Sequence, residues 1–153
     1  MNSWKARPER GDRPVLKIKR LSEDAIIPTR GTDGSAGLDL YATEDQTIFP
    51  GDIVAVHPRI AMEIPPGYYG LLVTRSSMGK RGIRIAAGAN IIDSDYRGEV
   101  IAYMANDGVY PCKLQRGDRF VQIVITPYIP CMVQEVETLS ETGRKGGFGS
   151  TGK

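Results

Sequence analysis

The chain has 153 residues, enough for one substantial hydrophobic core and too few for two, so a single domain is expected. Hydrophobic residues make up 41% and charged residues 25%, and no apolar run approaches the roughly 20 residues of a membrane helix, so no membrane partner is expected. The net charge of +2 argues against a basic face that binds nucleic acid, and a polar N-terminus without an apolar stretch predicts a cytoplasmic protein.

The order of apolar and polar segments predicts an all-β domain. Residues 1–13 are polar and Arg-rich, which favours a flexible N-terminal arm, and the folded domain is expected over residues 14–138. Short apolar runs bounded by turn residues occupy residues 15–21, 35–42, 46–49, 52–64, 68–74, 83–92, 99–106, 119–129 and 131–137. This spacing is typical of a sandwich or barrel, and a turn or two after Ser76 is the best helical candidate.

The cysteines and the single histidine suggest no metal centre. Cys112 and Cys131 lack a CxxC spacing and neighbouring histidines, so we expect two reduced, buried thiols and neither a zinc site nor a disulfide. His57 lies in the run DIVAVHPRI and is interpreted as a residue of a strand face or turn.

Two strand regions carry groups suited to binding an anion. Alternation in AGLDLYA places Asp39 on the strand face opposite Leu38 and Leu40, where a lone carboxylate is expected to be solvated. The segment Thr74–Gly79, TRSSMG, follows an apolar strand and offers a guanidinium, two hydroxyls and free backbone N–H groups, which suit a triphosphate. An Arg–carboxylate surface pair with a serine cap explains the same residues without a ligand.

A third stretch, GANIIDSDYRGEV at residues 88–100, combines two carboxylates with a tyrosine between two strand-like runs. We interpret it as a β-hairpin whose turn holds Asp93, Asp95 and Tyr96. Asp93 and Asp95 share strand parity, so one is suited to act as a base while the other supports the turn, although such a sequence is also ordinary turn chemistry.

A polar residue within the last strand and the end of the chain complete the set. Gln122 interrupts the apolar run at residues 120–125, where a buried amide needs partners: a fold-stabilising contact, a subunit-interface bond or a ligand. The final GFGSTGK matches P-loop spacing, but with no Ser or Thr and no helix after Lys153 the match is taken as coincidental. Residues 139–153 are instead expected to be a flexible, Gly-rich lid over a bound phosphate.

In this order, five segments resemble the motifs of the trimeric, all-β dUTP diphosphatase (dUTPase) family. They are AGLDLYA, RSSMG, GANIIDSDYRGE, RGDRFVQIVI and RKGGFGSTG, and the resemblance runs from Ser35 to Gly152. It implies a jelly-roll-like distorted β-barrel with little helix, and a homotrimer with active sites shared between subunits. It also implies Mg²⁺-dependent hydrolysis of dUTP to dUMP and pyrophosphate, which keeps uracil out of DNA and supplies dUMP for thymidylate synthesis.

The resemblance also implies residue roles. Asp93 would be the general base, and Asp39 would hold Mg²⁺ through water. Tyr96 would lie beneath the sugar and Phe148 would stack on uracil as the lid closes. The full set expected to bind substrate is Arg75, Ser76, Ser77, Gly79, Asn90, Ile91, Ile92, Tyr96, Ile101, Gln122, Arg144, Phe148, Gly149 and Ser150.

Two departures from the family pattern and two alternatives remain at this stage. The tail arginine is usually five residues before the phenylalanine, a position that Gly143 occupies here, with Arg144 next to it. Asn90 stands where glycine is common, and asparagine tolerates a left-handed backbone. A dCTP deaminase-like enzyme shares the Arg-Ser-Ser segment, and a non-catalytic nucleotide-binding regulatory trimer is the other alternative.

Overall fold

The computed structural model describes residues 13–143 and confirms an all-β chain with one short helix. Ten of the eleven strands lie within the runs predicted to be strands, and only the short β10 lies outside them. The elements in chain order are β1 Lys17–Arg20, β2 Leu38–Tyr41, β3 Gln46–Ile48, β4 Ile53–Val56, β5 Ile60–Glu63, β6 Tyr68–Thr74, α1 Ser76–Gly79, β7 Ile83–Ile85, β8 Asn90–Ile92, β9 Ala102–Asn106, β10 Cys112–Leu114 and β11 Arg119–Pro127. The helical turn expected after Ser76 is confirmed as α1.

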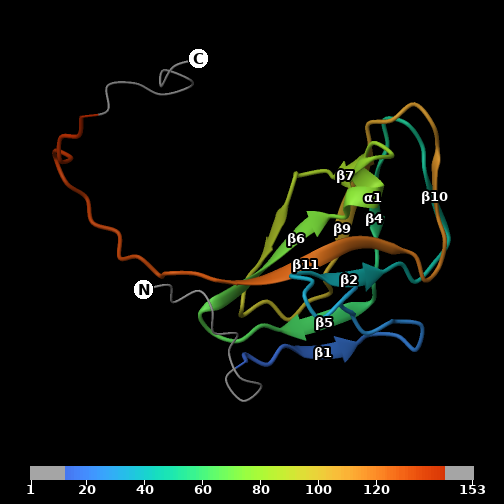
Figure 1. The fold of residues 1–153 in the computed structure, drawn as a ribbon, viewed down its shortest axis with the longest axis horizontal. Coiled ribbons are helices and arrows are strands. Elements are labelled where there is room, and N and C mark those ends of the chain that lie inside the picture. The colour runs from blue at the N-terminus through green and yellow to red at the C-terminus, as the bar shows by residue number, and fades with distance from the viewer. Residues whose placement is uncertain (1–12, 144–153) are drawn as a thin grey trace.

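The strands form four antiparallel sheets in a jelly-roll-like arrangement. The largest has the order β2-β11-β6-β8, a second has the order β4-β9-β7, and the pairs β1-β5 and β10-β3 flank them. In Figure 1 the long β11 crosses the middle of the molecule with β2 and β6 on either side. Among the described residues the four ladders do not join into one closed barrel, so the domain is a sandwich of sheets around one core.

The core is built from the inward faces of these sheets. Ile60, Met62 and Ile64 alternate along β5 and its end, and each is at most 2% exposed, as their period of two predicts. Phe120 and Ile123 of β11 are fully buried in the same cluster. β11 is thus held between β2 and β6 and by its buried side chains, and it also contributes residues to the site described below.

The hairpin predicted around residues 88–100 is wrong. The single run at residues 83–92 divides into β7 and β8, which belong to different sheets, with a turn at Gly88 (φ 82°) between them. β8 pairs with β6, whereas β9 pairs with β4 and β7. Residues 93–101 therefore form a loop that crosses from one sheet to another, because apolar alternation identifies a strand without identifying its partner.

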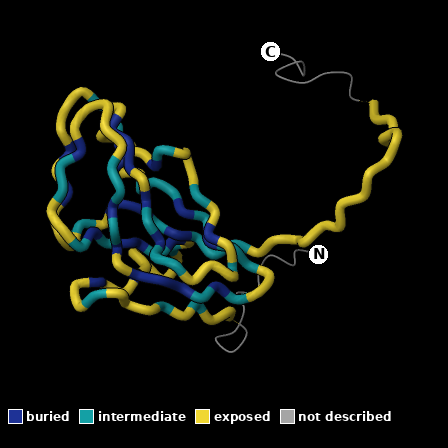
Figure 2. The backbone as a smooth tube through the Cα atoms, turned by 180° about the vertical axis from the view of Figure 1, so that it is seen from behind, coloured by how far each residue is buried: buried dark blue, intermediate teal, exposed yellow. Residues whose placement is uncertain are grey.

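The run at residues 131–137 was also expected to be a strand, and it is not one. Beyond β11 the described chain leaves the body as an exposed, extended segment, seen as the yellow trace in Figure 2. A strand needs an edge to pair with, and this segment pairs with none among residues 13–143. Cys131 is consequently exposed, contrary to prediction, whereas Cys112 is buried and burial raises the pKa of its thiol.

No helix within residues 13–143 has the length and apolar character needed to cross a bilayer.

Candidate functional site

The four-stranded sheet brings four of the predicted site residues to one cavity of about 200 Å³, here called the cationic cavity. Asp39 of β2 lies directly opposite Gln122 of β11, and β6, the other neighbour of β11, leads into Arg75. Cross-strand neighbours project from the same face of a sheet, which explains why residues far apart in sequence meet here. The lining residues are Gly31, Ser35, Gly37, Asp39, Arg75, Ser76, Arg119 and Gln122.

Asp39 is buried rather than solvated, which corrects the expectation from the isolated strand. The residue is 7% exposed, and its Oδ1 lies 2.8 Å from Nε of Arg75. Its Oδ2 lies 3.4 Å from Nη1 of Arg119. A carboxylate can leave water at low cost when two guanidinium groups replace its hydration. With one carboxylate and two guanidiniums, the cavity keeps an excess positive charge that suits an anion.

Arg75 is held in place by more than this ion pair. Its Nη1 donates to the backbone carbonyl of Arg119 at 3.1 Å and to Oγ of Ser77 at 3.4 Å. Ser77 belongs to an adjoining cavity of about 220 Å³ lined by Arg75, Ser77, Met78, Arg81, Asp118 and Arg119. The α1 segment follows Arg75 directly, and the first amides of a helix have no partner within it. The bonded guanidinium of Arg75, the nearby hydroxyls and the amides at the start of α1 are donors that suit an anion such as phosphate.

Sequence reasoning missed Arg119, which lines both the cationic cavity and the adjoining cavity that contains Ser77. A period of two places Arg119 and Gln122 on opposite faces of β11 because they are three residues apart. The β11–β2 register shifts between Arg119 and Val121, and this irregularity turns both side chains toward the same cavity. Only the RGDR turn before the strand signals such a residue in the sequence, and it does not reveal the bulge.

Gln122 approaches the backbone of Gly37 closely. A Cβ placed on Gly37 would lie 2.4 Å from Oε1 of Gln122, so this position requires glycine as long as the amide keeps its place. The Gln122 amide forms no hydrogen bond with another residue in the part of the chain that the structure describes. Of the three roles considered for it, an intramolecular fold-stabilising bond is therefore absent within residues 13–143, and its amide faces the cavity.

A second group of predicted residues lies around the loop at residues 93–101, in what we call the loop cavity, of about 330 Å³. Its lining residues are Ile91, Ile92, Asp93, Tyr96, Glu99, Ile101 and Tyr103. Five of these were predicted to bind substrate or act in catalysis, and the structure brings them together. Asn90 of β8 pairs with Leu72 of β6, and Gly79 is the last residue of α1. Neither Asn90 nor Gly79 lines the cationic cavity or the loop cavity.

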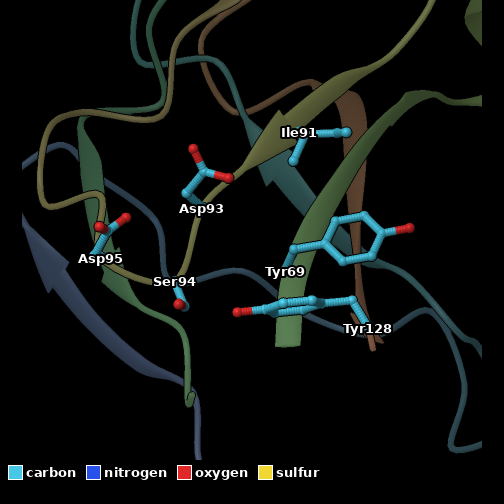
Figure 3. Close-up of a pocket in the computed structure, with 6 residues that line it drawn as sticks. All are labelled: Tyr69, Ile91, Asp93, Ser94, Asp95 and Tyr128. Carbon is cyan, nitrogen blue, oxygen red and sulfur yellow. The ribbon is translucent and has the colours of Figure 1, made fainter. Parts of the chain in front are cut away.

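Asp93 stands between the loop cavity and a larger cavity of about 660 Å³. Figure 3 shows it just beyond Ile91, with Asp95 further along the loop and the rings of Tyr69 and Tyr128 across the cavity. The two tyrosine rings pack edge to face, with their centroids 6.5 Å apart. The Asp93 carboxylate is exposed and accepts no hydrogen bond from the rest of residues 13–143. It is thus free to accept a proton from a water molecule.

The cationic cavity and the loop cavity do not meet within one chain. β2 and β8 are the two edges of the same sheet, about 14 Å apart, and Arg75 follows the end of β6 that points away from Asp93, because Ile92 pairs with Gly70 near the start of β6. No residue lines both cavities. Arg144, Phe148, Gly149 and Ser150 lie outside the described residues.

The donor groups fit only one kind of metal site. Residues 13–143 contain no group of three or more His, Cys, Asp or Glu that would hold a metal ion. Asp39 is the single carboxylate of the cationic cavity and is already paired with two arginines. Such a set fits Mg²⁺ that keeps most of its waters and is shared with phosphate oxygens, rather than a site built from protein ligands alone.

Comparison with known proteins gives a consistent result. Residues 23–152 match the dUTPase family model. The deoxyuridine 5'-triphosphate nucleotidohydrolase of Anaeromyxobacter sp. (strain Fw109-5) is 45% identical over 144 residues, which cover 91% of this chain and 98% of that protein. The human mitochondrial protein of the same name is 40% identical over 99% of this chain and 60% of its own length. The structure of a Staphylococcus bacteriophage 80alpha dUTPase with dUPNHPP superposes with a TM-score of 0.84 at 25% identity, covering 90% of this chain and 98% of that chain.

Proposed function

The chain belongs to the dUTPase family, and on this premise we propose that it hydrolyses dUTP to dUMP and pyrophosphate with Mg²⁺ bound to the triphosphate. The observation that carries this proposal is the division of chemistry between the two cavities. One supplies fixed positive charge and hydroxyls, and the other supplies a free carboxylate beside an aromatic residue. Hydrolysis of a nucleoside triphosphate needs both.

In the proposed reaction, Asp93 accepts a proton from a water molecule as that water attacks the α-phosphorus of dUTP. The new bond joins the water oxygen to the α-phosphorus, and the bond to the oxygen that bridges the α- and β-phosphates breaks. That oxygen leaves with the electron pair as part of pyrophosphate. Because Asp93 is exposed and unpaired among the described residues, its carboxylate is available for this proton.

Arg75, Arg119 and Ser76 bind and orient the triphosphate and offset its charge. Their positions are set before substrate arrives, because Arg75 is bonded to Asp39 and to the carbonyl of Arg119. Preorganised charge of this kind lowers the barrier without the cost of reorienting donors during the reaction. Mg²⁺, when bound, neutralises phosphate charge, and Asp39 is the carboxylate that would hold it through coordinated water.

Selection of the nucleoside is assigned to the loop cavity. Backbone groups of β8 and the side chain of Ile101 border a space for the uracil ring, and Tyr96 restricts the space for the sugar. A ribose hydroxyl would compete with the Tyr96 ring for volume, and a thymine methyl would compete with the cavity wall. Size exclusion is supplemented by fixed backbone donors and acceptors that a cytosine would leave unpaired.

We further propose that each complete site forms between copies of the chain in a homotrimer. In one chain Asp93 follows Ile92, which pairs with Gly70 near the start of β6, whereas Arg75 follows the other end of β6. The extended chain from Gly70 to Arg75 spans about 17 Å, which is too far for Asp93 to reach a water beside a phosphate held by Arg75. The exposed segment at residues 128–143, which carries Met132 and Val133 at over 95% exposure, gives the chain a surface to bury against another copy.

The predicted lid, residues 139–153, remains part of this proposal. Phe148 would cover the base, and Arg144 with Ser150 would reach the outer phosphates. Closure would exclude bulk water from the reacting phosphate.

The direct test measures pyrophosphate release from dUTP, dCTP, dTTP and UTP in parallel, with Mg²⁺ or with EDTA, and ammonia release from dCTP. We expect release from dUTP to be far faster than from the other nucleotides, lost in EDTA and restored by Mg²⁺. Ammonia from dCTP would indicate a deaminase, and no release from any nucleotide would indicate a binding protein. Unchanged activity in EDTA would contradict the metal requirement.

Site sharing has its own test. Two inactive variants, Asp93→Asn and Arg75→Ala, are unfolded together and refolded as a mixture. If complete sites combine Arg75 of one copy with Asp93 of another, random assembly restores about a quarter of the sites. The mixture should regain activity that neither variant shows alone, whereas continued inactivity would place both residues in one chain's site.

A further inference from the structure

The loop at residues 93–101 carries Asp93 and Tyr96, yet its internal bonds do not fix its position on the body. The Tyr96 amide donates to the Asp93 carbonyl at 3.1 Å, and Nη1 of Arg97 donates to the Ser94 carbonyl at 2.6 Å. Both bonds join loop residues to one another. They define the shape of the turn, so its placement must come from bonds to other elements.

Bonds to other elements come from the end of the loop, where the Val100 amide donates to the Ile60 carbonyl at 3.0 Å and the Glu99 side chain contacts the turn between β4 and β5. Oε1 of Glu99 accepts a hydrogen bond from the backbone N–H of Arg59 at 3.0 Å. Its Oε2 lies 3.2 Å from Nδ1 of His57 and 3.6 Å from Nη1 of Arg59. The Glu99 side chain is 15% exposed and that of His57 25%, so the carboxylate is largely shielded from water, although the Arg59 side chain is 44% exposed. Both carboxylate oxygens are thus used to join the loop to the turn between β4 and β5.

The partner turn has a backbone shaped for this contact. Arg59 has φ of 53° and is the one non-glycine residue with positive φ in the described part of the chain. This conformation is unfavourable for a residue with a Cβ and persists where surrounding bonds hold it. Here the Arg59 N–H is bonded to Glu99, and the Arg59 carbonyl accepts from the amide of Leu21 at 2.8 Å. The strained residue, Arg59, is therefore the one whose N–H donates to the Glu99 carboxylate.

Glu99 also contacts Tyr96 through its main chain. The Tyr96 hydroxyl donates to the Glu99 backbone carbonyl at 3.0 Å. The ring lies so close to the intervening glycine that a Cβ on Gly98 would be 2.4 Å from the hydroxyl oxygen. One residue therefore joins the body through its side chain and the Tyr96 ring through its backbone.

From this geometry we infer that Glu99 is a positioning residue for nucleoside selection, acting through the His57–Arg59 turn on one side and Tyr96 on the other. The inference rests on the proposed function, in which Tyr96 limits the space for the sugar. Glu99 and Tyr96 both line the loop cavity with Asp93, so a shift of the loop moves the group that selects the sugar and the proposed base together. Displacements near 1 Å are enough to change rates by about 100-fold.

The test compares Glu99→Ala with Glu99→Gln and measures kcat and KM for dUTP and for UTP. The alanine variant removes the acceptor for the Arg59 N–H, so we expect the ratio of kcat/KM for dUTP over UTP to fall at least about 10-fold. Glutamine keeps an oxygen acceptor for that N–H, so it should retain most of the selectivity. The matched control is Glu63→Ala, which removes a more exposed carboxylate paired with Lys17 and should leave the ratio unchanged.

The outcomes separate positioning from stability. If Glu99→Ala lowers the melting temperature while the dUTP/UTP ratio stays at the wild-type value, Glu99 is structural only and the inference is wrong. If alanine and glutamine lower the ratio equally, the bond to the Arg59 N–H does not position the loop, which also overturns it. Should the alanine variant fail to fold, Glu99→Asp keeps the charge but shortens the reach by one methylene. We then expect an intermediate loss of selectivity, and a wild-type ratio would contradict the inference.

The same assay distinguishes this inference from the proposed function. A wild-type protein that releases no pyrophosphate from dUTP overturns the proposed function and the premise of the inference with it. A selective wild-type enzyme together with an equally selective Glu99→Ala variant overturns the inference alone.

Discussion

The cationic cavity and the loop cavity differ in how their functional groups are held. In the first, Asp39 and Gln122 lie on paired strands of one sheet, and Arg75 and Arg119 are bonded to Asp39. In the second, Asp93 and Tyr96 lie on a loop between two sheets, and the Asp93 carboxylate accepts no hydrogen bond within residues 13–143. The charged groups proposed to bind the triphosphate are thus held by bonds within and beside one sheet, whereas the proposed base and the proposed selecting residue lie on a loop that other bonds position.

This difference predicts that the two cavities fail in different ways. Damage to the cationic cavity should weaken binding of the triphosphate along with catalysis, because both depend on the same fixed charges. Damage to the loop cavity should affect turnover or selectivity with less effect on affinity.

The largest expected effect is that of Asp93→Asn. The amide cannot accept the proton of the attacking water, so we expect kcat for dUTP to fall about 1,000-fold. Because the phosphates bind elsewhere, the Kd for dUTP, measured by calorimetry, should stay within about threefold. A kcat near the wild-type value would remove Asp93 from the role of base, and a large loss of affinity would contradict the separation of the two cavities.

Arg75→Ala should lower kcat/KM for dUTP about 100-fold and, unlike Asp93→Asn, should also raise the Kd for dUTP more than about 10-fold. The change removes a guanidinium and leaves Asp39 with Arg119 as its ion-pair partner among the described residues. Arg84→Ala is the matched control, because Arg84 is an exposed arginine paired with Asp107 outside both cavities. Equal losses in the two variants would indicate a nonspecific effect of surface charge.

Gly37→Ala should perturb the cationic cavity more mildly. The added Cβ would lie 2.4 Å from Oε1 of Gln122, so the amide must swing away, and we expect KM for dUTP to rise about 10-fold. Gly34→Ala is the control, since its nearest neighbour, Oγ1 of Thr32, would be 3.9 Å away. An unchanged KM in the Gly37 variant would mean that Gln122 does not contact the substrate.

The smallest effect is expected for Tyr96→Phe. The ring remains, but the hydrogen bond to the Glu99 carbonyl is lost, at a cost of about 1 kcal/mol. The dUTP/UTP ratio of kcat/KM should fall a few-fold while the Kd for dUTP stays unchanged. A loss as large as that expected for Glu99→Ala would show that the hydroxyl itself, rather than the placement of the loop, governs selection.

The sequence by itself determined the fold class and the family, and it predicted the site residues. Alternation along runs such as residues 60–64 predicts strands because side chains in a strand point alternately to opposite faces, and the helical turn after Ser76 follows directly from its segment. The five ordered motifs identified Asp39, Arg75 and Gln122, which the structure then places in one cavity. The strand and helix predictions succeeded because they depend on patterns within one segment, and the roles of the site residues stay predictions.

The tertiary structure decided which strands pair and which faces meet. It showed that β8 and β9 are not a hairpin, that residues 131–137 pair with nothing in the described chain, and that Asp39 is buried between two arginines. Arg119 entered the cationic cavity through a bulge that reverses its expected face, and Glu99 met His57 across 42 residues of sequence. Each of these features depends on contacts between distant segments, and a local pattern specifies the kind of element a segment forms but not the partner it meets.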